Sequence, residues 1–327
     1  MSLLLGVDGG GTKTDVLLAT RDGRVVARAR SGPSNHEAVG LDGALAALSQ
    51  GVTACLSAAG AAEGDVVASG WGLSGVDFPP DTLAYGELVD RLGLGGPRVV
   101  LNDAYVALRA GSPSGIGIAV NSGTGVIAAG RNPGGAVFRT LGVGAGFGDW
   151  GSGGDIVRAA VHAVAQEFTG LGPPTALTAG FLARTGAPTP SEFLERWWRR
   201  REVVVLTPAD VWEVAEGGDA VAADIAERVA GSLTAAAAAV ARRLSMDGPD
   251  HDPYPVVLAG GVLSPGHPVL RTRLASALVA ELPAGRPARL AATPAAGAVM
   301  EAARLLGDLA DTFCARLLAG APVARDP

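Results

Sequence analysis

The strongest constraint on this chain is a glycine-rich turn between two apolar strands. Residues 3–20 read LLLGVDGGGTKTDVLLAT, so a strand over 3–8 ends at Asp8 and a second strand over 13–20 follows the glycines. A turn with so few side chains lets backbone N–H groups approach an anion such as a nucleotide phosphate. The GxGxxG and Walker loops both open a helix, whereas this chain continues as a strand. A hairpin turn without a ligand is the alternative, but it usually needs only two special residues.

A second glycine turn occurs about 110 residues further along the chain. It joins predicted strands over 116–121 and 126–129, and its residues are Ser122, Gly123, Thr124 and Gly125. Between the two turns, hydrophobic periodicity predicts strands over 24–30, 66–73 and 98–101 and helices over 41–59, 80–92 and 104–110. This order of elements matches one ribonuclease-H-like lobe. The sequence therefore predicts an α/β fold with two ribonuclease-H-like lobes around a nucleotide cleft.

The repeat divides the chain into three predicted segments. Residues 1–112 form an N-terminal lobe, 113–294 form a C-terminal lobe with a helical insertion, and 295–327 form a C-terminal helix that packs back on the N-terminal lobe. The stretch Gly111–Gly115 reads GSPSG and is the predicted interlobe hinge. Within the C-terminal lobe we expect strands over 135–141, 255–259 and 288–292, a glycine-dense loop over 142–154, and mostly helix over 176–246.

Composition favours a soluble cytoplasmic enzyme that acts on small molecules. Of the 327 residues, 48% are hydrophobic, which is ample for a core, and the net charge of −6 argues against a nucleic-acid partner. We expect no membrane partner, because the apolar runs are broken by glycine and charge, and the N-terminus lacks a basic region. Cys55 and Cys314 make neither a disulfide framework nor a CxxC metal site. The sequence leaves a homodimer open.

Five short motifs carry a family resemblance, in the order DGGGTKT (8–14), LNDA (101–104), NSGTG (121–125), GDWGSG (148–153) and LAGGV (258–262). In this order the chain resembles the actin/heat-shock-chaperone/sugar-kinase superfamily. Within that superfamily it looks most like the N-acetylglucosamine kinase branch, which also contains activator ATPases of 2-hydroxyacyl-CoA dehydratases. The resemblance implies an ATP-dependent kinase whose substrates are ATP and an amino sugar of the N-acetylglucosamine or glucosamine type, with the sugar 6-hydroxyl as acceptor.

Phosphoryl transfer needs backbone donors, a divalent metal and a base. The predicted nucleotide-binding residues are Gly9, Gly10, Gly11, Thr12, Lys13, Ser122, Gly123, Thr124 and Gly125, and the resemblance adds Gly260 and Gly261 beside the adenosine. Asp8 is a hard oxygen ligand suited to Mg²⁺, held through water. Lys13 either adds charge near the phosphates or points to solvent. Gly260 and Gly261 have a simpler alternative as a tight turn after a strand.

Asp103 is the predicted catalytic residue. It follows a strand and precedes a helix, where Asp also serves as an N-cap. By resemblance, the Asp of this motif is the general base that takes the proton from the attacking sugar hydroxyl. The capping role does not exclude the catalytic one.

The resemblance places the sugar against four residues: Asn35, Ser74, Gly75 and Asp149. Each has a structural alternative, since loop Asn and Ser tie turns and Asp149 could cap the following helix. Three positions differ from the family pattern. Glu37 stands where Trp is usual, Trp150 replaces a Glu, and Ile127 replaces a polar residue. These changes affect the sugar side of the site and leave the phosphate chemistry intact.

Two other functions fit members of the same superfamily. An activator ATPase of a dehydratase or reductase holds a [4Fe–4S] cluster through cysteines at a dimer interface, and the sequence around Cys55 and Cys314 lacks that motif. A sugar-responsive repressor carries an N-terminal helix-turn-helix domain, whereas here the first predicted strand begins at residue 3. The amino-sugar kinase is therefore the main prediction and the activator its alternative.

Overall fold

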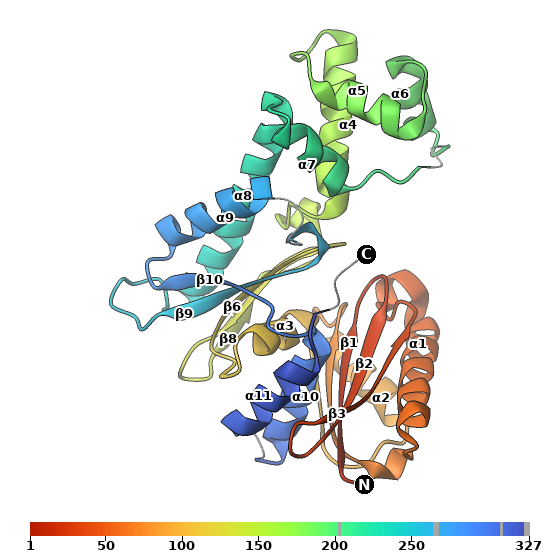
Figure 1. The fold of residues 1–327 in the computed structure, drawn as a ribbon, viewed down its shortest axis with the longest axis vertical. Coiled ribbons are helices and arrows are strands. Elements are labelled where there is room, and N and C mark those ends of the chain that lie inside the picture. The colour runs from red at the N-terminus through yellow and green to blue at the C-terminus, as the bar shows by residue number, and fades with distance from the viewer. Residues whose placement is uncertain (202–203, 264–267, 308–309, 324–327) are drawn as a thin grey trace.

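The computed structural model describes residues 1–201, 204–263, 268–307 and 310–323 as two lobes, each built on a five-stranded mixed sheet (Figure 1). The first sheet contains β1 (Leu3–Gly9), β2 (Thr14–Thr20), β3 (Val25–Ser31), β4 (Val66–Leu73) and β5 (Arg98–Leu101). The second contains β6 (Gly117–Ser122), β7 (Val126–Arg131), β8 (Val137–Arg139), β9 (Tyr254–Ala259) and β10 (Gly285–Arg289). Their strand orders, β3-β2-β1-β4-β5 and β8-β7-β6-β9-β10, are equivalent, which confirms the predicted fold with two similar lobes.

The first sheet is buried on both faces because its strands carry apolar side chains on both sides. Alternate residues of a strand point to opposite faces. Leu3 and Leu5 of β1 pack with α1 (His36–Ala59) and α2 (Pro79–Asp90), whereas Leu4 packs with α10 (Pro294–Leu305) and α11 (Asp311–Gly320). Figure 1 shows these two helical layers on either side of the sheet. The last helices of the chain thus complete the core of the first lobe.

Helices α3 and α10 join the lobes. Helix α3 (Asp103–Gly111) packs on β6 and β7 of the second sheet, and α10 packs on β1 and β4 of the first. Glycines allow α10 to approach both β4 and α3 closely: a Cβ at Gly70 of β4 would lie 2.0 Å from the Ala298 carbonyl oxygen, and one at Gly297 of α10 would lie 2.0 Å from that of Val106 in α3. The two helices therefore pack directly on one another between the sheets.

The second lobe carries most of its helices beyond its sheet. These are α4 (Gly153–Thr169), α5 (Ala176–Thr185), α6 (Pro190–Trp198), α7 (Pro208–Glu216), α8 (Ala220–Arg243) and α9 (Pro268–Glu281). Helix α8 lies against β6 and β7, and its buried alanines and valines form one cluster with the sheet. Helices α5 and α6 lie at the end of the molecule farthest from the first lobe (Figure 1).

The predicted hinge Gly111–Gly115 is a hydrogen-bonded turn. The Ser112 hydroxyl donates to the Ile116 carbonyl oxygen (2.7 Å), and an Arg109 guanidinium nitrogen donates to that of Pro113 (2.8 Å). A Cβ at Gly111 would meet the Val257 side chain at 2.4 Å, so this glycine is packed as well. These contacts would have to break for the turn to act as a hinge, and the hinge stays a prediction.

Three predicted element bounds also need correction. Strand β10 ends at Arg289 instead of continuing to residue 292, and β8 covers only Val137–Arg139 of the predicted 135–141. Helix α1 begins five residues before the predicted start at 41, at His36, because Asn35 caps it and Gly40 (φ 70°) allows a kink that the sequence pattern did not show. Glycine-rich flanks hide such boundaries from hydrophobic periodicity.

By length and composition alone, helix α1 could cross a membrane, since its most apolar stretch has a mean hydropathy of 1.3. Its apolar face, however, is already used. Ala44, Leu48, Val52 and Cys55 are buried against the first sheet. Helix α1 is therefore packed as a core helix, and this packing explains its apolar composition.

Candidate active site

The two glycine turns face each other across the lobes. A Cβ built on Gly11, in the turn between β1 and β2, would lie 3.8 Å from Thr124 Cγ2 in the turn between β6 and β7. Two backbone hydrogen bonds fix the first turn: the Ser74 N–H donates to the Gly9 carbonyl oxygen (2.8 Å), and the Ser34 N–H donates to that of Gly10 (3.1 Å). The predicted phosphate-binding segments of both lobes therefore meet at one place.

The second turn is packed against the end of β9. Gly260 adopts φ 93°, and a Cβ there would lie 2.2 Å from the Ser122 carbonyl oxygen, so only glycine fits. Gly261 has no atom within 4 Å of its Cβ position, and a Cβ on Gly123 would lie 3.8 Å from the Gly261 nitrogen. An exposed surface free of side chains thus extends from the second turn to Gly261.

Not every residue of the two turns offers a free polar group. The Ser122 side chain is fully buried, and its hydroxyl donates to the Gly151 carbonyl oxygen (2.8 Å). Thr12 and Thr124 are exposed at the tips of their turns. Lys13 is 46% exposed, and its ammonium lies 3.5 Å from an Asp15 carboxylate oxygen. Lys13 therefore lies at the surface beside Asp15 and is close enough to Asp8 to oppose the rise in its pKa.

Two carboxylates come together at the ends of their strands, next to the turns. Asp8 lies at the end of β1 and Asp103 opens α3 just after β5. Burial, and then repulsion by Asp103 and Asp15, raises the pKa of Asp8 to about 8, with Lys13 opposing the shift. Burial also raises the pKa of Asp103 to about 6, to which Asp77 adds repulsion. Both carboxyl groups therefore bind a proton more tightly than an ordinary Asp side chain does.

These carboxylates fit the predicted Mg²⁺ site in their chemistry. Mg²⁺ keeps several waters and needs only one or two protein carboxylates when a phosphate supplies the rest. Among the described residues no group of three or more His, Cys, Asp or Glu could enclose a metal ion. Burial and the nearby Asp103 disfavour the charged form of Asp8. A bound cation would offset both effects, so Asp8 is the first candidate for a metal ligand.

Three of the four predicted sugar-binding residues lie together. The Asn35 amide nitrogen donates to the Ser74 hydroxyl (3.2 Å), and a Cβ on Gly75 (φ 84°) would lie 2.7 Å from Asn35 Oδ1. The same Oδ1 accepts from the Glu37 N–H and caps α1, so the structural and binding roles share one side chain. Ser74 follows β4 directly, and this places the group at the same edge of the sheet as Asp8.

Tyr85 supports this group and was missed by the sequence analysis. Its hydroxyl donates to the Ser34 carbonyl oxygen (2.6 Å) and accepts from the His36 N–H (2.9 Å). The His36 ring packs edge-on against Tyr85, with ring centroids 5.3 Å apart. Within the described residues His36 Nδ1 is buried without a hydrogen-bond partner. A buried Tyr in the predicted helix over 80–92 was the available signal, because a buried phenol needs a partner.

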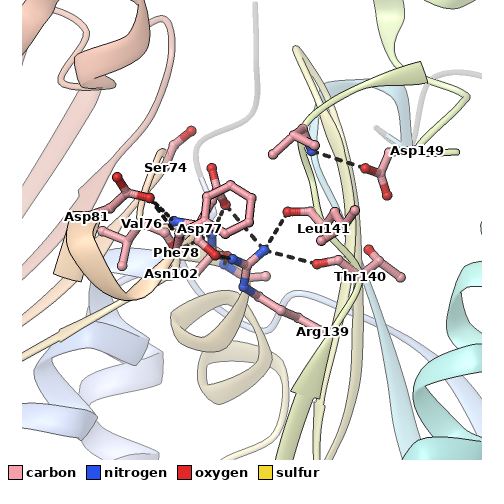
Figure 2. A network of polar contacts seen from close by, with 12 residues as sticks. Ser74, Val76, Asp77, Phe78, Asp81, Asn102, Arg139, Thr140, Leu141 and Asp149 are labelled. Atoms are coloured by element: carbon pink, nitrogen blue, oxygen red, sulfur yellow. Dashed lines mark hydrogen bonds and ion pairs between the residues drawn. The ribbon is translucent and has the colours of Figure 1, made fainter. Parts of the chain in front are cut away.

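Asp149 belongs to the second lobe and lies across from Ser74 of the first lobe (Figure 2). Its side chain is 8% exposed, and one carboxylate oxygen accepts from the Val143 N–H (3.1 Å). It does not cap the next helix, since Ser152 accepts from the Asp155 N–H there. Asp149 thus closes the glycine-dense loop, and no bond joins it to the Asn35 group among the described residues.

A second missed feature is an ion pair that crosses between the lobes (Figure 2). The Arg139 guanidinium, from β8, lies 3.3 Å from an Asp77 carboxylate oxygen in the loop after β4. Asp77 also accepts from the Asn102 amide (3.1 Å), and Asn102 caps α3 by accepting from the Ala104 N–H (3.0 Å). The signal was present, because Arg139 is the one charged residue of the predicted strand 135–141.

Two of the family departures are explained by packing. Ile127 is 7% exposed and fills a small cluster between the lobes with Ala104 and Tyr105 of α3. Trp150 lies under the Arg228 guanidinium, 3.9 Å from the ring centroid to Cζ, and packs against the core of the second lobe. Neither residue contributes a hydrogen-bonding side-chain group toward the Asn35 group. The polar contacts at this part of the site must therefore come from other residues.

The chain is similar to curated kinases over most of its length. It is 31% identical over 268 residues to the N-acetylmuramic acid/N-acetylglucosamine kinase of Clostridium acetobutylicum, covering 81% of this chain and 86% of that protein. It is also 31% identical over 276 residues to the N-acetyl-D-glucosamine kinase of Dictyostelium discoideum, covering 79% and 85%. A solved Chromobacterium violaceum structure, provisionally described as an N-acetylglucosamine kinase, matches with a TM-score of 0.67, 25% identity and 92% and 98% coverage.

The family model for the BadF/BadG/BcrA/BcrD ATPase family matches residues 5–302. This range runs from β1 through most of α10 and includes both glycine turns, Asp103 and Gly260. With the match covering both lobes, the chain belongs to the BadF/BadG/BcrA/BcrD ATPase family.

Proposed function

We propose that this protein is an ATP-dependent kinase that phosphorylates an amino sugar of the N-acetylglucosamine or glucosamine type. The observation that carries the proposal is the position of Asp103. It stands at the start of α3, beside Asp8 and next to the Asn35 group, where the two lobes meet. Both curated relatives named above are kinases of such sugars.

Asp103 acts as the general base in this proposal. With a pKa of about 6 it is mostly ionised at neutral pH, yet it is basic enough to accept a proton. The sugar 6-hydroxyl oxygen forms a bond to the γ-phosphorus while the bond to the ADP oxygen breaks. The hydroxyl proton passes to an Asp103 carboxylate oxygen, so charge and atoms balance.

The sugar is held by the residues that lie around this base. The Asn35 amide and the Ser74 hydroxyl offer donors and acceptors for the sugar hydroxyls, and the missing side chain of Gly75 lets Asn35 pack close to the backbone there. Asp149 approaches from the second lobe with acceptor capacity beyond its bond to the Val143 N–H. Contacts from both lobes would orient the 6-hydroxyl toward Asp103.

The glycine turns hold the phosphates through backbone N–H groups, from Gly11 and Thr12 in one lobe and from Thr124 and Gly125 in the other. The N–H groups of Gly10 and Gly123 are not available for this, because they donate to the Lys13 and Gly125 carbonyl oxygens (both 2.9 Å). Gly260 and Gly261 provide a surface without side chains for the adenosine. Asp8 would hold Mg²⁺ through water, and the bound ion would neutralise charge that develops on the phosphates.

The activator ATPase is the less favoured alternative. A shared [4Fe–4S] cluster needs cysteine thiolates at a surface, whereas Cys55 and Cys314 are both buried. They belong to separate clusters on opposite faces of the first sheet. Burial also raises the pKa of the Cys55 thiol to about 11, which disfavours the thiolate that binds iron.

A substrate screen tests the proposal directly. The protein is incubated with MgATP and glucosamine, N-acetylglucosamine, N-acetylmuramic acid, N-acetylmannosamine or glucose, and ADP release is followed. The position of the phosphate in the product is then read by ³¹P and ¹³C NMR. We expect one amino sugar to exceed glucose in kcat/KM and to carry phosphate on the 6-oxygen. ADP release that no sugar stimulates would contradict the proposal.

A further inference from the structure

We propose that Arg139 is a positioning residue that links the second lobe to the catalytic base. It binds Asp77 across the lobe interface and thereby fixes Asn102 and the N-terminus of α3, on which Asp103 stands. The kinetic part of this inference rests on the proposed kinase function. The structural part, that the pair holds the two lobes together, does not.

Backbone carbonyl oxygens of both lobes hold the Arg139 side chain. One guanidinium nitrogen donates to the carbonyl oxygens of Thr140 (3.0 Å) and Leu141 (2.5 Å), and the other donates to the Asp77 carbonyl oxygen. Figure 2 shows the guanidinium between these two sets of oxygens. Such a fixed geometry loses little entropy when the ion pair forms.

Asp77 is equally fixed on the first lobe. Its backbone N–H donates to Asp81 Oδ2 (3.1 Å), as does that of Phe78 (2.7 Å), so α2 holds the loop in place. The Asp77 carboxylate then accepts from the Asn102 amide (3.1 Å). The side chains of Arg139 and Asp77 are 16% and 7% exposed, so this is a mostly buried pair between two ordered partners.

Opening of the lobes would separate this pair. Asp77 would then lose its guanidinium partner, and of these contacts only the Asn102 amide would still hold its carboxylate side chain. Because Asn102 caps α3 through Oδ1, a shift of its side chain moves the first turn of the helix and Asp103 with it. The pair therefore makes the position of the base depend on closure of the lobes.

The first experiment needs no substrate. Small-angle scattering compares the ligand-free wild type with Arg139→Ala, and we expect a larger radius of gyration for the variant. Arg98→Ala is the matched control, since Arg98 binds Asp90 through two nitrogens (2.5 and 2.6 Å) within the first lobe. Thermal unfolding confirms that each variant is folded. If Arg139→Ala does not fold, Arg139→Gln is measured in its place. Equal radii for wild type and variant would overturn the lobe link.

The second experiment separates positioning from a general loss of stability. Loss of a charged hydrogen bond at the interface predicts about a 10- to 100-fold lower kcat for Arg139→Ala, with the KM for ATP changed less than about threefold. Arg139→Lys restores part of the rate, and Asp77→Asn combined with Arg139→Gln costs much less than the product of the two single effects. Additive losses, or equal losses in Arg98→Ala, would overturn the positioning role.

The outcomes distinguish this inference from the proposed function. Wild-type protein that phosphorylates no amino sugar contradicts the kinase, while a larger radius for Arg139→Ala still supports the lobe link. An active wild type with an unaffected Arg139→Ala variant supports the kinase and contradicts the inference.

Discussion

The two glycine turns have the same place in equivalent sheets but a different chemistry. Asp8 is the residue before the last of β1, and Asn121 holds the same place in β6. Burial, and then repulsion by Asp103, raises the pKa of Asp8, whereas the Asn121 side chain packs against the Gly260 backbone. The strand end before the first turn therefore carries an ionisable side chain, whereas the one before the second turn carries a side chain that is always neutral.

This difference divides the work of the site between the lobes. The first lobe supplies the groups that can bind a cation or accept a proton, namely Asp8 and Asp103. The second supplies the neutral turn around Gly123 and the surface at Gly261, which suit the nucleotide through backbone contacts. We infer that changes in the first lobe act mainly on kcat and changes in the second mainly on ATP affinity.

The largest expected effect is that of Asp103→Asn. Removal of a general base typically costs about 10²–10⁴-fold in rate, so kcat should fall by that factor. Helix α3 should remain intact, because Asn102 rather than Asp103 provides its N-cap. Calorimetry should find ATP binding unchanged. If ATP binding were lost together with the rate, Asp103 would be structural and the division between the lobes would fail.

Asp8→Ala and Asn121→Ala test the two equivalent strand positions against each other. We expect Asp8→Ala to lose more than about tenfold in kcat, which corresponds to about 1.4 kcal/mol. Asn121→Ala removes no charge, so its kcat should change by less than about threefold, a loss of under about 0.7 kcal/mol. Steady-state kinetics at saturating MgATP measures both. Similar losses at the two positions would contradict the assignment of the metal to the first lobe.

The fold and the charged half of the site could be predicted because their signals are local in sequence. The strand before Asp8, the glycines after it and the strand before Asp103 each lie within a few residues. The carboxyl ends of parallel strands share one edge, so β1, β4 and β5 bring Asp8, Ser74 and Asp103 together.

The interlobe contacts could not be predicted, because they join segments that no local pattern relates. Arg139 and Asp77 are 62 residues apart and meet only through the arrangement of the lobes. The bonds within the stretch Gly111–Gly115 are a similar case: composition predicted a hinge there, but it gave no sign of the hydrogen bonds from Ser112 and Arg109. Turn residues report the backbone geometry they allow and not its mobility.

The glycines of the two turns give the next comparison. Gly11→Ala and Gly261→Ala both have room for a Cβ in the ligand-free protein, so neither should lower the melting temperature. Each methyl group would stand where we propose that the nucleotide binds, and we expect about a 3- to 30-fold weaker Kd for ATP, or about 0.7–2 kcal/mol. Gly260→Ala is the contrast, because its Cβ would lie 2.2 Å from a carbonyl oxygen and should destabilise the fold. Unchanged ATP binding in Gly261→Ala would remove the adenosine from that surface.

A stability measurement probes the charge of the first turn without any ligand. Because the pKa of Asp8 in the folded protein, about 8, exceeds the ordinary value of 3.8 for this side chain, the folded state binds the proton more tightly than the unfolded state does. Stability is therefore lost as the pH rises from about 4 to about 8. Asp8→Asn removes this penalty and should unfold at about 2 °C or more above wild type at pH 8, with no difference near pH 4. A wild type that is as stable as the variant at pH 8 would contradict the buried carboxylate.

The smallest expected effect is at Lys13, which decides whether charge from the first turn reaches the phosphates. Its ammonium is exposed and close to Asp15, and exposed pairs are worth about 0–1 kcal/mol, so Lys13→Gln should change kcat/KM by less than about fivefold. A second experiment follows the Lys13 amine directly. Lys13 is the chain's one lysine, so an acylating reagent modifies only its side-chain amine and the α-amino group of Met1. Mass spectrometry then gives both acylation rates in one sample, and Met1, 59% exposed and bonded to Asp65, serves as the internal control. If Lys13 lies near the phosphates, MgATP slows its acylation and leaves that of Met1 unchanged. Equal rates with and without MgATP would place Lys13 in solvent and confine the charge of this turn to Asp8.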